Sequence, residues 1–101
     1  MKQNNPKIEK RKMDYEIKPN LKKVLNKISK KDSFMHERIL KKIQEIIDSD
    51  PEHYKNLRHD LKEFKRVQLG PFVLVFKFVK LENKIYFEDF DHHDKIYLKR
   101  F

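Results

Sequence analysis

The sequence predicts an α+β fold in the order β-α-α-β-β-β, with a helical hairpin on one face of a small, mostly antiparallel, twisted sheet. Three observations predict it: an alternating segment near the start, two successive amphipathic helical segments, and three β-rich segments in the second half. A chain of 101 residues has room for one domain with one core.

The first strand is predicted over residues 13–17, where Met13, Tyr15 and Ile17 alternate with charged residues. Pro19 ends this strand and suits the first turn of a helix. The residues after it have the i, i+3, i+4, i+7 spacing of one apolar helix stripe, formed by Leu21, Val24, Leu25 and Ile28.

A second helix is predicted after Asp32 and Ser33, which are both suitable N-caps. Its apolar stripe consists of Met35, Ile39, Ile43, Ile46 and Ile47, with Leu40 at the edge. Asp50-Pro51 ends this helix. Residues 51–63 have no clear period, so we expect a connecting loop there.

Three strands follow, over residues 64–69, 72–79 and 85–90, with turns at Gly70-Pro71 and residues 81–84. Their short connections indicate an antiparallel meander. Two helices cover one sheet face only, so the opposite face is expected to be open. The side chains expected on that open face are Arg66, Gln68, Val73, Val75 and Lys77.

The formal net charge of +9 predicts a polyanionic partner. Residues 1–12 contribute five basic residues and one acid, hence +4, and the rest of the chain contributes +5. The sequence therefore divides into a flexible basic arm, 1–12, and a single domain, 13–101. Because Lys is abundant along the whole chain, a generally Lys-rich proteome is an alternative explanation of the charge.

The chain contains no cysteine, so neither a disulfide nor a thiolate nucleophile is available. Its longest apolar run, residues 72–79, is interrupted by Lys77 and is too short to span a bilayer as a helix. We expect a cytoplasmic protein that has no membrane partner.

Two segments resemble the RelE/ParE toxin superfamily, in particular its RelE-like members. These are NLRHDLKEFKRVQLGPFVLVFKF, residues 56–78, and FEDFDHHDKIY, residues 87–97. The resemblance extends from Met13 to about Phe101 and includes the βααβββ order. It implies a toxin of a type II toxin–antitoxin system that cleaves mRNA, typically on the ribosome, and so inhibits translation. The ParE branch implies the alternative, a non-catalytic inhibitor of DNA gyrase.

The resemblance also implies roles for particular residues. Arg66 matches a strand position where RelE-like members place a basic residue against RNA, and Gln68 occupies the next inward position. Val73 stands where many members have a catalytic Arg, so the phosphate-stabilising group is changed in this chain. His92 matches a frequent family His, and His93 stands where others have an Arg, four residues before Tyr97.

RNA can be cut by its own 2′-hydroxyl, which requires a base, an acid and a cation at the phosphate, but no metal or other cofactor. Histidine suits the acid–base roles because it titrates near neutrality. The predicted catalytic residues are Arg66, His92, His93 and Tyr97. The predicted RNA-binding residues are Arg58, Lys62, Lys65 and Gln68.

Each assignment has a structural alternative. His92 and His93 are also explained as surface residues, or as part of a metal site with Asp91 and Asp94. Tyr97 is equally explained as an aromatic residue at the core edge, and Arg66 as an ion-pair partner of Glu88.

The expected protein partner is a cognate antitoxin, acidic and partly disordered, that folds on the basic face of the toxin. The other expected partners are mRNA and the ribosome. DNA is expected to bind only through the antitoxin.

Overall fold

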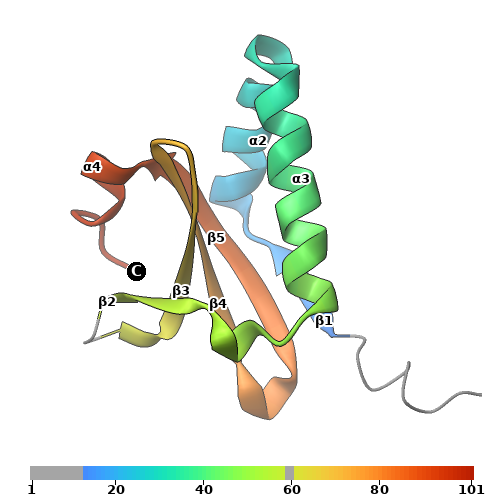
Figure 1. The fold of residues 1–101 in the computed structure, drawn as a ribbon, viewed down its shortest axis with the longest axis vertical. Helices are drawn as coiled ribbons and strands as arrows, with labels where there is room; N and C mark the ends of the chain where they lie inside the picture. Colours follow the sequence, from blue (N-terminus) through green and yellow to red (C-terminus); the bar gives the residue numbers. More distant parts are fainter. Residues whose placement is uncertain (1–12, 59–60) are drawn as a thin grey trace, which may run out of the picture.

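The computed structural model describes residues 13–58 and 61–101, and gives the backbone alone for residues 61 and 62. The predicted basic arm, 1–12, therefore lies outside the described residues. The elements, coloured along the chain in Figure 1, are β1 (Asp14–Ile17), α2 (Pro19–Lys31), α3 (Ser33–Asp48), η1 (Pro51–His53), β2 (Lys55–Arg58), β3 (Leu61–Leu69), β4 (Phe72–Val79), η2 (Lys80–Glu82), β5 (Lys84–His92) and α4 (His93–Ile96).

The strands form one sheet in the order β1-β5-β4-β3-β2. β1 runs parallel to β5, and the other neighbouring strands are antiparallel. The predicted meander is therefore correct. The helical hairpin connects β1, at one edge of the sheet, to β2 at the opposite edge.

The helical hairpin covers one face of the sheet, as the period of its apolar residues predicts (Figure 1). Pro19 occupies the first turn of α2, and the Asp32 carboxylate caps α3 by accepting a hydrogen bond from the Met35 backbone N–H at 3.1 Å. The core under the helices joins both stripes to apolar residues of β3, β4 and β5; its buried members are Leu21, Leu25, Ile39, Ile43, Ile46, Ile47, Leu69, Leu74, Phe76, Ile85, Phe87 and Phe90.

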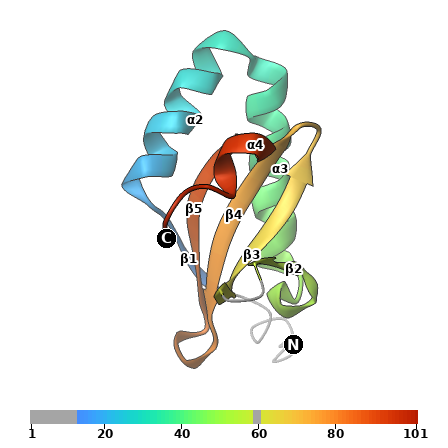
Figure 2. The same ribbon diagram turned by 90° about the vertical axis from the view of Figure 1, so that its left-hand side faces the viewer.

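The opposite face is only partly open, so this expectation was wrong for part of the face: Val73 and Val75 are buried, whereas Gln68 is exposed and Arg66 and Lys77 are half-buried. Figure 2 shows α4 and the C-terminal residues lying across the sheet on the side away from α2 and α3. Ile96 of α4 is fully buried in a second apolar cluster with Leu57, Val73 and Val75. Val73 and Val75, which were expected to be exposed, are therefore covered because the apolar surface of β4 on this side binds the C-terminal segment.

The described part of residues 51–63 is not a connecting loop, which is a second correction. Pro51–His53 forms a 3-10 turn, and Lys55–Arg58 pairs with β3 as the fifth strand of the sheet. Only Leu57 of this strand is buried, because β2 is an edge strand whose other residues are polar. A strand with a single buried residue has no readable period.

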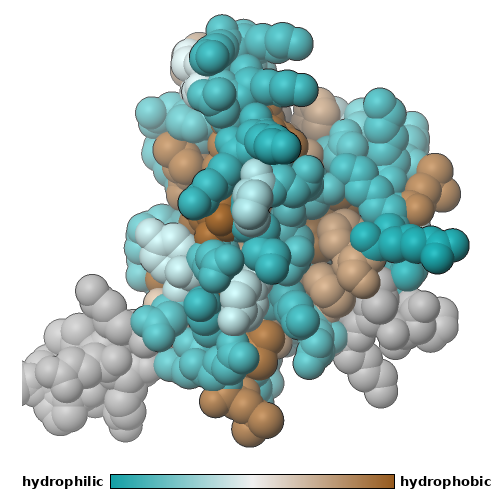
Figure 3. Space-filling view, turned by 180° about the vertical axis from the view of Figure 1, so that it is seen from behind, coloured by the Kyte–Doolittle hydropathy of each residue, from teal (hydrophilic) through white to brown (hydrophobic). Residues whose placement is uncertain are grey.

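The surface is mostly hydrophilic on the face drawn in Figure 3, with separate hydrophobic patches. The most exposed large apolar side chains of the described residues lie in different parts of the chain: Phe34 on α3, Leu81 on η2 and Leu98 after α4. Among the described residues, no helix has the length and apolar character needed to cross a membrane.

Candidate functional site

His92 and His93 lie at the junction where β5 ends and α4 begins. His92 is the N-cap of α4: its Nδ1 accepts a hydrogen bond from the Asp94 backbone N–H at 3.1 Å. The His93 N–H donates to the Pro71 carbonyl at 2.9 Å, which holds this junction against the β3–β4 turn. The two imidazole rings have centroids 4.9 Å apart.

Both imidazoles are accessible to a ligand, with side-chain exposures of 39% for His92 and 45% for His93. The Asp94 carboxylate lies 3.0 Å from Nδ1 of His93 and 3.6 Å from Nδ1 of His92. On its other side, the His92 ring meets Phe72 edge-on at 5.8 Å. The pair is thus fixed by neighbouring side chains while remaining reachable from solvent.

Tyr97 follows α4 directly and packs at the edge of the second apolar cluster. Its backbone carbonyl accepts a hydrogen bond from Nη1 of Arg58 at 3.4 Å. The fold therefore brings together one predicted catalytic residue and one predicted RNA-binding residue, which are 39 positions apart. The partial burial of Tyr97 also agrees with its alternative explanation as an aromatic residue at the core edge.

Arg66 lies on β3, opposite Val75 of β4 and Lys55 of β2. Its Nε donates to the backbone carbonyl of Asn56 at 3.2 Å. Its register places it on the side of the sheet that α4 covers. In the described part of the chain, no ion pair joins Arg66 to Glu88, so the alternative explanation of Arg66 has no support.

The remaining predicted RNA-binding residues do not share one surface. Gln68 is on the same side of β3 as Arg66, and its Nε2 donates to the Gly70 carbonyl at 3.0 Å. Lys65 alternates with Arg66 and therefore points to the helix side, where its Nζ donates to Asn56 Oδ1 at 2.9 Å. The side chain of Lys62 lies outside the described residues.

The four predicted catalytic residues are thus only partly brought together. His92 and His93 are adjacent, and Tyr97 lies in the same C-terminal segment. The ring of His92 packs against Phe72, whose side chain contributes to the helix-side core, whereas Arg66 shares the other face with Val75. α4 links these two environments because it starts at His93 and packs on the Arg66 side.

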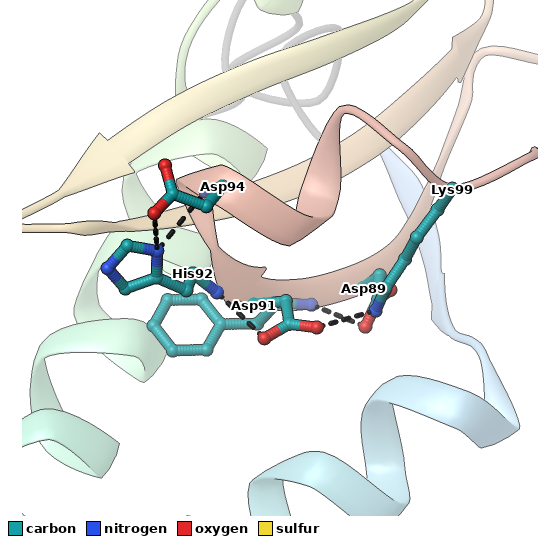
Figure 4. A network of polar contacts seen from close by, with 6 residues as sticks. Asp89, Asp91, His92, Asp94 and Lys99 are labelled. Atoms are coloured by element: carbon teal, nitrogen blue, oxygen red, sulfur yellow. Dashed lines mark hydrogen bonds and ion pairs between the residues drawn. The ribbon is translucent and has the colours of Figure 1, made fainter.

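Sequence reasoning missed a set of three charged residues beside this junction. Nζ of Lys99 lies 2.6 Å from Oδ2 of Asp89 and 2.9 Å from Oδ2 of Asp91 (Figure 4). The second oxygen of each carboxylate accepts a backbone N–H, that of Phe90 for Asp89 and that of His92 for Asp91, both at 2.8 Å. The i, i+2 spacing of the acids was a readable sign that they share a face, but nothing in the sequence pairs them with Lys99.

The surroundings of Asp91 and Lys99 favour their charged forms. Burial pushes the pKa of Asp91 upward, but hydrogen bonds from Lys99 and the His92 backbone outweigh it, so its pKa lies below the usual value. Burial likewise pushes the pKa of Lys99 downward, but hydrogen bonds to Asp89 and Asp91 raise it above the usual value. Asp89 itself is only 3% exposed.

His92, His93 and Asp94 are also close enough to share a metal ion, since one donor atom from each lies within 4.8 Å of the others. These residues are consecutive, and two of them are exposed. Nδ1 of His92 already accepts the Asp94 backbone N–H. The contacts of a helix N-terminus therefore account for their grouping.

Solved structures of RelE toxins share this fold. The isolated RelE toxin of E. coli superposes with a TM-score of 0.67 over 79% of this chain and 83% of that chain, at 16% identity. The RelBE2 toxin–antitoxin complex of Mycobacterium tuberculosis gives a TM-score of 0.55 over 81% and 99%, at 18% identity. A conserved hypothetical protein of Helicobacter pylori gives 0.55 over 81% and 96%, at 22% identity.

Two proteins that are similar in sequence identify the family of this chain. It is 50% identical over 88 residues to the putative toxin RelE4 of Methanocaldococcus jannaschii, covering 86% of this chain and 93% of the relative. It is 40% identical over 82 residues to an uncharacterized protein of Methanosarcina mazei, covering 80% and 94%. No family model matches the sequence. The chain belongs to the RelE family, the toxins of type II toxin–antitoxin systems.

Proposed function

We propose that this toxin is an endoribonuclease that cleaves ribosome-bound mRNA without a metal ion and thereby inhibits translation. The observation that carries the proposal is the pair of accessible imidazoles of His92 and His93, held at the β5–α4 junction of a RelE-family chain. Two adjacent imidazoles provide one proton acceptor and one proton donor, which cleavage by the RNA 2′-hydroxyl requires.

In the proposed reaction, one imidazole takes the proton of the 2′-hydroxyl as that oxygen attacks the adjacent phosphorus. The other gives a proton to the departing 5′-oxygen, so the chain breaks and a 2′,3′-cyclic phosphate remains. A guanidinium holds the phosphate oxygens as their negative charge grows. Tyr97 supplies a ring for base stacking or a hydroxyl donor.

Arg66 and Arg58 are the proposed guanidinium groups. By resemblance, Val73 stands at the position where many RelE-like toxins carry an Arg. This valine is 1% exposed and lies beneath α4. An Arg there would have to displace the buried Ile96, so this chain needs its phosphate-binding cation elsewhere. Arg66 lies on the α4 side of the sheet, and Arg58 contacts the Tyr97 carbonyl.

A cognate antitoxin is the proposed protein partner. The solved RelBE2 relative is a toxin–antitoxin complex, and the net charge of +9 suits an acidic, partly disordered antitoxin that folds on binding. DNA contact by such a complex is proposed to occur through the antitoxin.

The proposal is tested by mapping mRNA cuts with primer extension during induced expression. The wild type is compared with a His92→Ala/His93→Ala double variant and with a His36→Ala/His53→Ala control, which removes two histidines from α3 and η1. Cleavage is expected to fall by about 10²-fold or more in the first variant and to persist in the control. Growth arrest with intact mRNA would instead support the ParE-like alternative, inhibition of DNA gyrase without catalysis.

A further inference from the structure

The C-terminal segment is fastened to the sheet at two different points. The first is apolar: Ile96 is fully buried against the α4 side of the sheet. The second is ionic: Lys99 reaches back to Asp89 and Asp91 on β5 (Figure 4). The helix that ends at Ile96 has only four residues, and Tyr97 and Leu98 join it to Lys99. A helix this short does not hold a shape by itself.

The ionic contact restrains its side chains more than a single surface ion pair does. Asp89 and Asp91 project from the same side of β5, and without a cation between them their like charges would repel. Each carboxylate is fully engaged, with one oxygen on Lys99 and the other on a backbone N–H. The two carboxylates therefore hold the ammonium group of Lys99 from two directions.

One of these contacts leads directly to the candidate active residues. Asp91 accepts the backbone N–H of His92, whose side chain in turn caps α4. Lys99 thus orients Asp91, Asp91 holds the His92 backbone, and His92 sets the start of the helix that carries His93 and leads to Tyr97.

We propose that Lys99, acting through Asp89 and Asp91, is a positioning residue that aligns the His92–His93 turn and Tyr97 over the sheet. The inference rests on the proposed function for its catalytic part. Burial of Ile96 already supplies an apolar anchor, and replacing a partly buried ion pair with apolar groups often costs no stability. The specific contribution of Lys99, Asp89 and Asp91 is therefore to fix the direction in which the C-terminal segment runs across the sheet.

The test uses the full-length chain with three substitutions. Lys99→Met removes the charge while keeping an unbranched side chain, and Lys99→Arg keeps the charge. Lys80→Met is the matched control. Lys80 also pairs with a carboxylate, that of Glu52, but this ion pair is at the surface and involves neither β5 nor the C-terminal segment. Circular dichroism establishes that each variant is folded.

Cleavage of a defined mRNA on programmed ribosomes is measured together with amide hydrogen exchange at His93, whose N–H donates to the Pro71 carbonyl. For Lys99→Met we expect kcat to fall by at least about tenfold with KM nearly unchanged. Exchange at His93 should rise by a similar factor. Lys99→Arg should recover most of both values, and Lys80→Met should match the wild type.

Wild-type kcat and wild-type His93 exchange in a folded Lys99→Met variant would overturn the proposal. If Lys99→Met does not fold, Asp91→Asn decides, because it leaves the buried Asp89–Lys99 contact in place and should still lower kcat and speed His93 exchange. If the wild type cuts no RNA, the proposed function fails, whereas the exchange measurement still decides whether Lys99 aligns the turn.

Discussion

Lys99 and Asp89 are ten residues apart in the chain, and their Nζ and Oδ2 atoms meet at 2.6 Å on the side of the sheet away from the helical hairpin. Nζ of the same lysine lies 2.9 Å from Asp91. One cation near the C-terminus thus pairs with two carboxylates on β5. Stability and the geometry of the histidine junction are therefore connected through charge, which makes both sensitive to pH and to substitution.

The first prediction concerns pH. The pKa of Asp91 is lower in the folded chain, so its contribution to stability is present above the unfolded value, roughly pH 4, and is lost as the pH falls through the folded value. The pKa of Lys99 is raised, so its contribution is lost only in the alkaline range, as the pH rises through its folded value. Urea unfolding of the wild type and Asp91→Asn at several pH values measures this. The two should differ near pH 7 by about 1 kcal/mol or less and converge at acid pH; a constant difference would contradict the prediction.

The second prediction concerns the apolar anchor of α4. Ile96→Ala should lower the free energy of unfolding by about 2–4 kcal/mol, because it leaves a cavity among Leu57, Val73 and Val75. Leu98→Ala is the control, since that side chain is 82% exposed and its removal should change stability by less than about 0.5 kcal/mol. Denaturant titration compares them, and equal effects would show that α4 does not pack on the sheet in solution.

A third substitution tests the β3–β4 turn. Gly70 has a φ of +61°, in the left-handed region, and a Cβ built there meets no atom within 4 Å. The cost of Gly70→Ala is therefore the backbone alone, about 1 kcal/mol, and Gly70→Asn should cost less because Asn tolerates this conformation better. Thermal unfolding ranks the two variants. If Gly70→Asn were the less stable one, the turn would have a different conformation.

The fourth prediction concerns Glu88, whose ionisation is expected to lower the stability of the fold, in contrast to that of Asp91. Burial raises its pKa, and the nearby cations Lys18 and Lys77 only partly oppose this. The charged carboxylate therefore costs stability at neutral pH, and that cost disappears as the pH falls through the raised value. Glu88→Gln should raise the free energy of unfolding at pH 7 by up to about 1 kcal/mol and have little effect near pH 4. A loss of stability at pH 7 would mean that the carboxylate has a favourable partner in solution.

Much of the fold was readable from the sequence because its elements are locally consistent. The stripes of both helices, the Asp32 cap, the Gly70 turn and the three-strand meander were all predicted and are all present. β2 was missed because an edge strand with one buried side chain has no pattern that distinguishes it from a loop.

The candidate site was readable only in part. The sequence indicated His92, His93, Tyr97 and Arg66, and their roles remain predictions. It gave no indication that Arg58 lies at the Tyr97 carbonyl or that Lys99 holds Asp91. Those contacts join residues on different elements, and their partners depend on how the C-terminal segment folds back over the sheet.

By itself, the sequence determined the α+β class, the helix-covered face, the basic charge and the resemblance to RelE toxins, because these follow from local periodicity, composition and adjacent motif residues. Only the tertiary structure decided that the C-terminal segment covers part of the second face, since one buried isoleucine and one lysine draw the last residues onto β4 and β5. The affinity of a short segment for a distant surface depends on the apolar and charged groups that the assembled sheet presents together, and no segment carries that information alone.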